Sequence, residues 1–359
     1  MPHFVSINQL LNNTQPVGVG TTLIRKIQLS HSFEDIVSVD NLLLAWEEFI
    51  KGKRNKKDVQ EFSYNLMSNI FSLHNDLVHL TYKHDPYQAF NISDPKPRNI
   101  HKASVRDRLL HHAVHRILYP FFDRTFISDS FSCRINKGTH KAINRFRSFA
   151  YKESNNNTEI CYILKCDIRK FFASINHKTL RNILQEYIKD EKIVWLLKEI
   201  INSFHLKPNT GLPLGNLTSQ LFANIYLNKL DQFIKHKLKA KYHIRYSDDF
   251  VVLSQNKEYL KEIAYRVKHF LENELKLELH PNKISIKTLY SGQDFLGWIN
   301  FPDHRILRNT TKKRMLKRIE ENPKEEVICS YLGMLKHGNM VKVKRDIIKR
   351  DIIWKYGID

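Results

Sequence analysis

The chain has 359 residues, 42% of them apolar, so it can bury a large core in one composite domain or in two to three lobes. Its 58 lysines and arginines outnumber its 37 aspartates and glutamates, which gives a formal net charge of +21. Such a charge predicts a polyanionic partner: nucleic acid first, an anionic membrane surface second, with an inert basic surface as the alternative. Four cysteines without a CxxC pair indicate neither a zinc ribbon nor a disulfide framework.

The N-terminal segment MPHFVSINQLL lacks the basic and apolar stretches of a signal peptide. No apolar run approaches the roughly 18 residues needed to cross a bilayer. We therefore expect no membrane partner and a reducing, cytoplasmic setting.

The first half of the chain predicts mainly helices. Apolar residues recur at three- and four-residue spacing within 40–75. Two prolines exclude 94–98 from a helix interior. The segment 104–119 predicts an amphipathic helix, with Ser104 or Asp107 near its cap.

The second half alternates strand and helix signals. A buried strand is predicted at 161–168, mainly helix at 177–204, a helix from the turn 211–215 to about Leu238, and a hairpin at 242–254. Further elements are a helix at about 257–275, a strand at 284–289, a turn at 291–298 and a basic, mostly helical tail from 311. The alternation predicts an α+β fold with helices packed on one face of a sheet.

Three aspartates lie where strands are predicted to end. Asp248 and Asp249 are adjacent between two strand-like runs, where their like charges repel. A polar hairpin tip explains them alone, but Asp167 also ends an apolar strand. If the strands are neighbours, Asp167 and Asp248 meet at one sheet edge. Three carboxylates can hold two Mg²⁺ about 3.5–4 Å apart, which would activate a primer 3′-hydroxyl and bind a triphosphate.

Several segments in order along residues 90–300 resemble the motifs of reverse transcriptases. They are PKPR (95–98), CDIRKFFASI (166–175), YSDD (246–249), LHPNK (279–283) and FLGW (295–298). The resemblance implies a right-hand polymerase with fingers, a palm built on an antiparallel sheet with helices on one face, and a small helical thumb. We expect the N-terminal region and fingers at 1–160, the palm at 161–300 with finger elements around 177–212, and the thumb at 301–359.

The sequence further resembles reverse transcriptases of diversity-generating retroelements, a group related to group II intron-type and retron enzymes. LGNLTSQ (214–220) matches their altered QGxxxSP motif, and SVRDRLLHHAV, SFSCRINKGTH and FPDHRILR are also similar. The resemblance implies a bacterial, archaeal or phage-encoded enzyme that copies a template RNA with errors at template adenines. It also implies a DNA or RNA primer, dNTPs, two Mg²⁺ ions that Mn²⁺ can replace, and a small basic accessory protein.

The resemblance assigns catalysis and metal binding to Asp167, Asp248 and Asp249, with the backbone carbonyl of Ile168 completing one coordination shell. The residues expected at the nucleotide are Lys96, Arg98, Phe172, Leu214, Gly215 and Lys283. Those expected at the template or primer are Ser219, Gln220, Tyr246, Phe295, Leu296, Gly297 and Trp298.

The nucleotide contacts each have a chemical rationale and an alternative. Lys96 and Arg98 suit a triphosphate, or belong to a solvated loop. Phe172 would clash with a ribose 2′-hydroxyl, or is a plain core aromatic. Lys283 would neutralise the leaving group, or is a surface lysine. Gly215 allows close backbone approach.

Leu214 replaces the usual glutamine, so we expect looser checking of the nascent base pair. Arg106, Arg108, Arg134, Lys137 and the stretch 312–318 are candidates for a basic channel. His111 and His115 lie one helical turn apart but lack a third ligand, so a zinc site is not favoured.

Other functions remain open. A reverse transcriptase of a phage-defence or intron-derived system would carry the same motifs, although no long C-terminal extension for a maturase or endonuclease is visible. An RNA-dependent RNA polymerase shares the palm, but Phe172 argues against it. A non-catalytic RNA-binding module would be indicated by loss of an aspartate, and all three are present.

Overall fold

The structure is a computed structural model that describes residues 27–93 and 97–356. The chain folds into two compact units, each assembled from separate segments. The first unit contains the segment up to Ser128, then Ile168–Lys237 and Tyr265–Asn282. The second contains Asp129–Asp167, Leu238–Ala264 and the segment from Lys283 onward. The division into fingers, palm and thumb stays a prediction.

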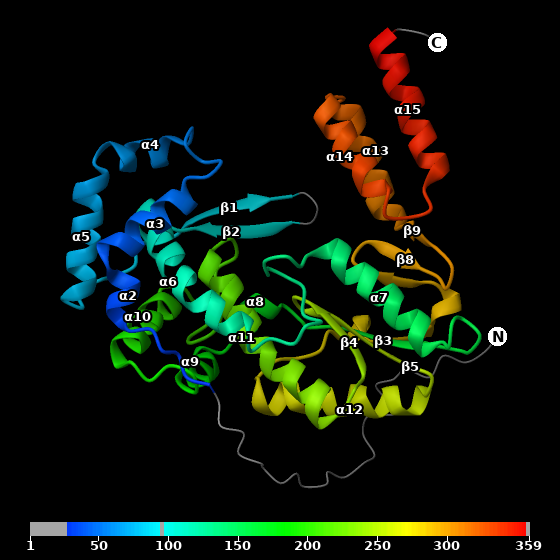
Figure 1. Ribbon diagram of the computed structural model, residues 1–359, viewed down its shortest axis with the longest axis horizontal. Coiled ribbons are helices and arrows are strands. Elements are labelled where there is room, and N and C mark those ends of the chain that lie inside the picture. The colour runs from blue at the N-terminus through cyan, green and yellow to red at the C-terminus, as the bar shows by residue number, and fades with distance from the viewer. Residues whose placement is uncertain (1–26, 94–96, 357–359) are drawn as a thin grey trace. The chain divides into compact units, whose positions relative to one another are not determined.

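The first unit is mainly helical (Figure 1). Its helices are α2 (Phe33–Val37), α3 (Val39–Phe49), α4 (Lys57–Tyr64), α5 (Leu66–Val78), α6 (Val105–Asp123), α8 (Phe171–Ser174), α9 (His177–Gln185), α10 (Glu191–Asn202) and α11 (Leu217–Gln232). A π-helical turn, Phe233–Lys237, continues α11. The strands β1 (Gln88–Ile92) and β2 (Arg98–Lys102) form an antiparallel hairpin.

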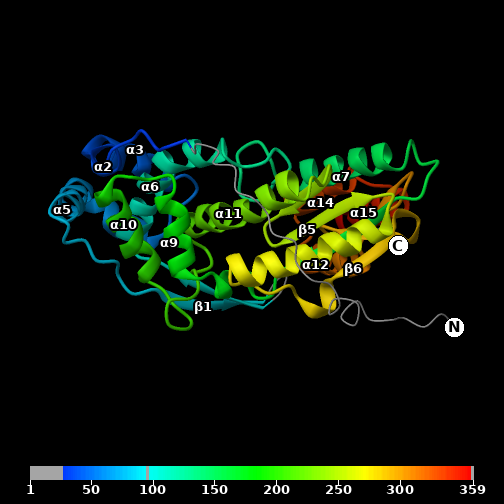
Figure 2. The same cartoon turned by 90° about the horizontal axis from the view of Figure 1, so that it is seen from below.

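Helix α6 forms the centre of this unit, packing against α3 and α11. Ser104 caps its start by accepting a hydrogen bond from the backbone N–H of Asp107. The Asp107 carboxylate is fully buried and accepts hydrogen bonds from Tyr82 Oη (2.7 Å) and the backbone N–H of Asp85 (3.0 Å). These bonds tie the segment before β1 to α6. Helices α9 and α10 lie beside each other (Figure 2).

The second unit is built on a four-stranded antiparallel sheet with the order β4-β5-β3-β6. The strands are β3 (Tyr162–Asp167), β4 (Tyr242–Tyr246), β5 (Asp249–Ser254) and β6 (Ser285–Thr288). Helix α7 (Thr139–Glu153) packs along β4 and β5, where the rings of Phe149 and Tyr242 are 4.9 Å apart (Figure 1). Helix α12 (Lys257–Glu274) begins in this unit and ends in the first.

The rest of the second unit is a small sheet followed by helices. The sheet contains β7 (Gln293–Phe295), β8 (Trp298–Asn300) and β9 (Arg305–Leu307), all antiparallel. The helices are α13 (Asn309–Glu321), α14 (Glu325–Leu335) and α15 (Val341–Tyr356). Two 3₁₀ turns, Pro281–Lys283 and Leu289–Ser291, flank β6.

The α+β class is confirmed, and the predicted helices and strands lie close to their expected positions. The expected turn at 291–298 is instead a hairpin of β7 and β8. The hairpin of β1 and β2, helix α7 and strand β9 were not predicted. Within the described residues, no helix is long and apolar enough to cross a membrane.

Candidate active site

The acidic centre begins with the hairpin of β4 and β5. Tyr246 pairs with Asp249, so Ser247 and Asp248 alone form the turn. Ser247 adopts a left-handed backbone with φ of 57°, as tight hairpin turns often require. The short turn places Asp248 at the tip and Asp249 at the first position of β5.

A buried arginine holds this turn in place. Arg245 is fully buried, and its guanidinium donates hydrogen bonds to Ser247 O (3.2 Å) and Ser130 Oγ (3.0 Å). Its backbone also pairs with the segment before α7: its N–H donates to Asp129 O, and its carbonyl accepts from Phe131 N, both at 3.0 Å. Sequence reasoning missed Arg245, because a single arginine in a strand gives no pattern that predicts burial.

Strand pairing brings the third carboxylate to the same place. Asp167, the last residue of β3, lies directly opposite Asp249 of β5. Side chains at such paired positions are neighbours, so the two like charges interact unfavourably. The expected approach of Asp167 to the hairpin is thus observed, with Asp249 as the paired residue.

Two lysines lie against these carboxylates. Lys283 Nζ is 3.1 Å from both oxygens of Asp167. Lys165 Nζ is 3.4 Å from Asp249 Oδ2 and also donates to the backbone carbonyl of Asp294 at 2.8 Å. Lys283 was a sequence candidate, whereas Lys165 was missed because its position depends on strand register.

Burial weakens the acidity of the hairpin carboxyls. The pKa of Asp248 is raised by burial first and by the nearby charge of Asp167 second. Burial, with Asp167 and Asp248 adding to it, raises the pKa of Asp249 to about 6, although Lys165 opposes the shift. Oδ1 of Asp249 is buried without a hydrogen-bond partner. A buried, unsatisfied carboxylate oxygen fits a cation as its missing partner.

The donor set suits a hard divalent cation, because Mg²⁺ prefers carboxylate oxygens. In the described residues, however, no three His, Cys, Asp or Glu side chains already stand together as a ready metal-binding group. Lys283 and Lys165 supply the opposing charge instead. The carboxylates therefore fit the expected metal ligands in type and place, while a bound cation would have to compete with the lysines.

The nucleotide candidates in the first unit come together from three segments. The backbone N–H of His101, in β2, donates to Leu214 O at 3.2 Å, and the N–H of Leu212 donates to Phe172 O at 2.8 Å. Gly215 has φ of 105°, and a Cβ there would lie 3.0 Å from Ile100 Cγ2. The hairpin strand carrying Arg98 thus lies beside the 212–215 loop.

Phe172 and Arg98 differ in accessibility. Arg98 is exposed at the start of β2, and Phe172 is half-buried with its ring centroid 5.4 Å from that of Phe171. The segment is helix α8, so the alternation expected for an extended strand does not apply. Lys96 lies outside the described residues. Ile168 is buried and bridges to Leu279, and the role of its carbonyl stays a prediction.

The template and primer candidates divide into exposed and packed residues. Leu296 and Gly297 form the β7–β8 turn with φ of 52° and 85°, a pattern typical of tight hairpins. Phe295 and Trp298, on either side, are buried in the core. Only the turn residues are therefore accessible to a primer.

The other candidates for strand contact are partly accessible. Ser219 is only 2% exposed, which leaves its side chain almost nothing to offer a template, whereas Gln220 is half-buried. Tyr246 is half-buried, and its hydroxyl accepts a hydrogen bond from Thr139 Oγ1 at 3.1 Å.

Two basic-channel candidates form ion pairs within the first unit. Arg106 pairs with Asp76 at 2.6 Å and Arg108 with Asp58 at 2.5 Å. These partners reduce the charge that either arginine can offer to a phosphate. Burial lowers the pKa of His111 and brings that of His115 to about 4, so both rings are neutral near pH 7.

An antiparallel sheet with carboxylates at one end, joined to a helical unit, is the architecture of a nucleotidyl-transfer enzyme. Residues 83–334 match the model of the family described as reverse transcriptase (RNA-dependent DNA polymerase). The chain belongs to this family.

Two curated relatives are more distant in sequence. Protein YkfC of Escherichia coli is 23% identical over 272 residues, covering 65% of this chain and 69% of that protein. The group II intron-encoded protein LtrA of Lactococcus lactis is 25% identical over 348 residues, covering 76% of this chain and 56% of LtrA. An apo telomerase structure from Candida tropicalis has a TM-score of 0.44 and 14% identity, covering 68% of this chain and 59% of that one.

Proposed function

We propose that this member of the reverse transcriptase family copies an RNA template into cDNA by two-metal nucleotidyl transfer. The observation that carries the proposal is the grouping of Asp167, Asp248 and Asp249 at one end of the second unit's sheet, with an unpartnered oxygen on Asp249. Template RNA, a DNA or RNA primer and dNTPs are the substrates, and the right-hand division into fingers, palm and thumb is part of the proposal.

In this mechanism the carboxylates hold two Mg²⁺ ions, which acidify the primer hydroxyl and neutralise the triphosphate when bound. Asp167 and Asp249 would exchange their lysine partners for the cations. Lys283, released from Asp167, is then placed to neutralise the departing pyrophosphate. Arg245 keeps the Ser247–Asp248 turn fixed throughout, because both its hydrogen bonds hold the hairpin rather than the substrate.

Phe172, Leu214, Gly215 and Arg98 would select and hold the dNTP. Their support is the backbone pairing that joins β2, the 212–215 loop and α8. The half-buried ring of Phe172 is the proposed barrier to a ribose 2′-hydroxyl. Leu296 and Gly297, with Tyr246 and Gln220, would contact the primer and template strands.

For the biological role, we propose a diversity-generating retroelement, with errors concentrated at template adenines and a small basic accessory protein. This rests on the LGNLTSQ segment at 214–220. The second candidate is an intron-derived enzyme, which the likeness to LtrA favours. Phage defence is a further alternative, and a non-catalytic RNA-binding protein is the least favoured.

The first experiment is dNTP incorporation on a primed RNA template with Mg²⁺, comparing the unaltered chain with Asp248→Ala and with the exposed-site control Asp303→Ala. We expect template-directed cDNA from the unaltered chain and the control, and none from Asp248→Ala. Sequencing the product separates the roles: errors confined to template adenines support the retroelement, and accurate copying supports the intron-derived enzyme. Product from Asp248→Ala, or silence even with native RNA and accessory protein, would contradict the catalytic proposal.

A further inference from the structure

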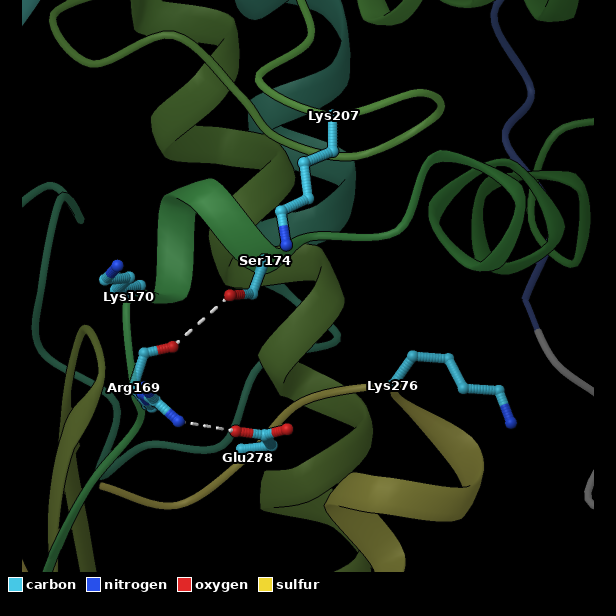
Figure 3. Close-up of a pocket in the computed structure, with 6 residues that line it drawn as sticks. All are labelled: Arg169, Lys170, Ser174, Lys207, Lys276 and Glu278. Atoms are coloured by element: carbon cyan, nitrogen blue, oxygen red, sulfur yellow. Dashed lines mark hydrogen bonds and ion pairs between the residues drawn. The ribbon is translucent and has the colours of Figure 1, made fainter. Parts of the chain in front are cut away.

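Two adjoining hollows in the first unit share the residue Lys276 and are lined mainly by cations. The first, about 280 Å³, is lined by Arg169, Lys170, Ser174, Lys207, Lys276 and Glu278 (Figure 3). The second, about 490 Å³, adds Asn176, Lys178, Thr179, Arg181, Asn182 and Asn209. We call the two hollows together the basic groove.

The groove carries far more positive than negative charge. Six of its lining side chains are lysine or arginine, and Glu278 is the one carboxylate among them. That carboxylate lies 3.3 Å from Arg169 Nη1 and is therefore already paired. The lysines at 170, 178, 207 and 276 are exposed. Such a surface attracts an anion from solution.

The backbone holds these cations in an unusual arrangement. The Arg169 N–H donates to Glu278 O at 2.8 Å, which fixes the two walls of the first hollow against each other. Lys170 and Lys276 have φ of 46° and 53°, a left-handed conformation that is uncommon for residues other than glycine and asparagine. Figure 3 shows Lys207 extending toward Ser174 from the opposite wall. Strained positions of this kind often occur at binding sites.

The lining chemistry indicates the sugar–phosphate backbone of RNA. Ammonium and guanidinium groups match phosphates, and the amides and hydroxyl of the second hollow match ribose 2′-hydroxyls. No aromatic ring is among the described side chains that line the groove, so base stacking is not its purpose. Two hollows sharing one lysine suit successive phosphates along a strand better than one compact nucleotide.

We propose that the basic groove binds RNA through its backbone, independently of sequence, as a contact additional to the acidic centre. This rests on the proposed function in that the RNA is the template molecule or a part of it. Lys207 and Lys276 would each contact a phosphate, and Arg181 with Lys178 would extend the contact along the strand. Glu278, already paired to Arg169, limits the affinity.

The test compares two full-length double variants with equal loss of charge. Lys207→Gln with Lys276→Gln alters the groove, and Lys189→Gln with Lys198→Gln removes two exposed lysines elsewhere in the first unit. Binding to a fluorescent single-stranded RNA is measured without divalent metal over a range of salt. We expect the groove variant to bind roughly tenfold more weakly at low salt, with a salt slope smaller by about 2, one per lost phosphate contact. The control should match the unaltered chain, and Glu278→Gln should bind more tightly.

Equal losses in both double variants would mean a general charge effect and overturn the proposal, as would an unchanged groove variant of native melting temperature. A raised KM for dNTP with unaltered RNA affinity would assign the groove to the nucleotide instead. Extension of a short primed template is measured in parallel. Absence of extension by the unaltered chain refutes the polymerase function, whereas the RNA-binding comparison stands or falls separately.

Discussion

At the residue scale, Asp249 combines a proposed catalytic role with an energetic cost. Its pKa is raised from an ordinary 3.8 to about 6, mainly by burial. The folded chain therefore binds this proton more readily than the unfolded chain does. The group favours folding below pH 3.8, and this contribution is lost as pH rises to about 6. At pH 7 the ionised carboxylate costs the metal-free fold about 2–3 kcal/mol.

We therefore predict that Asp249→Asn abolishes polymerisation yet raises the melting temperature of the metal-free protein at pH 7 by a few degrees. The difference from the unaltered chain should shrink as pH falls below 6, because Asp249 is then protonated. Thermal melts in a metal chelator measure it, with the exposed Asp303→Asn as control. A lower melting temperature for Asp249→Asn would show that its pairing with Lys165 outweighs its burial.

A second prediction concerns Leu214, where the related motif carries glutamine. Its side chain is half-buried and its carbonyl is fixed by His101, so a substitution changes the side chain without freeing the backbone. Leu214→Gln should lower misincorporation by severalfold, because an added amide can hydrogen-bond to the nascent pair. Error spectra of cDNA from both enzymes test this. Unchanged spectra would contradict it, and Leu214→Met serves as the apolar control.

At the element scale, the junction between α14 and α15 depends on one small residue. A Cβ at Gly338 would lie 2.2 Å from Trp298 Cζ3 and 2.9 Å from the carbonyl oxygen of Arg305. Gly333, inside α14, has nothing within 4 Å of such an atom. The Trp298 ring is therefore packed directly against the chain after α14, which explains its burial.

We predict that Gly338→Ala destabilises the protein by about 1–3 kcal/mol through overpacking. Gly333→Ala, the matched control, should stabilise it by up to about 1 kcal/mol, because alanine favours a helix. Melting temperatures of the two full-length variants measure both effects. Equal values for the two variants would mean that the 338 segment moves away from Trp298 at little cost.

The sequence predicted those elements whose signal is local. The helix expected at 104–119 is α6, Val105–Asp123, with Ser104 as its cap, because apolar spacing and capping are both written in neighbouring residues. The strands β7 to β9 have three residues each, too few to show alternation. The exposed, polar β1 and β2 also lack an alternating pattern.

The site followed the same division. Asp167, Asp248 and Asp249 could be identified because acidic residues end apolar, strand-like runs. Lys165 and Arg245 could not, since the first depends on β3–β5 register and the second on a backbone bridge to Ser130. Burial of Trp298 and Ser219 was equally hidden, because it depends on segments far away in the sequence.

At the scale of the whole molecule, the net charge of +21 must be borne by the free protein. Self-repulsion of such a charge opposes folding, and a bound polyanion relieves it. We predict that heparin raises the melting temperature at low salt and that the gain disappears near about 0.5 M salt, where screening is strong. Thermal melts across a salt series measure this. A gain independent of salt would contradict an electrostatic origin.

The interleaving of the two units also has a consequence for synthesis on the ribosome. The first unit needs Tyr265–Asn282, so the segment up to Ser128 leaves the ribosome long before its last partner exists. At about 5–20 residues per second, that wait is roughly 10–30 s. Helix α6 can pack on α3 at once, but the face that contacts α11 has to wait for Leu217–Gln232. A nascent chain of this protein therefore presents a half-covered core, a natural binding surface for a chaperone.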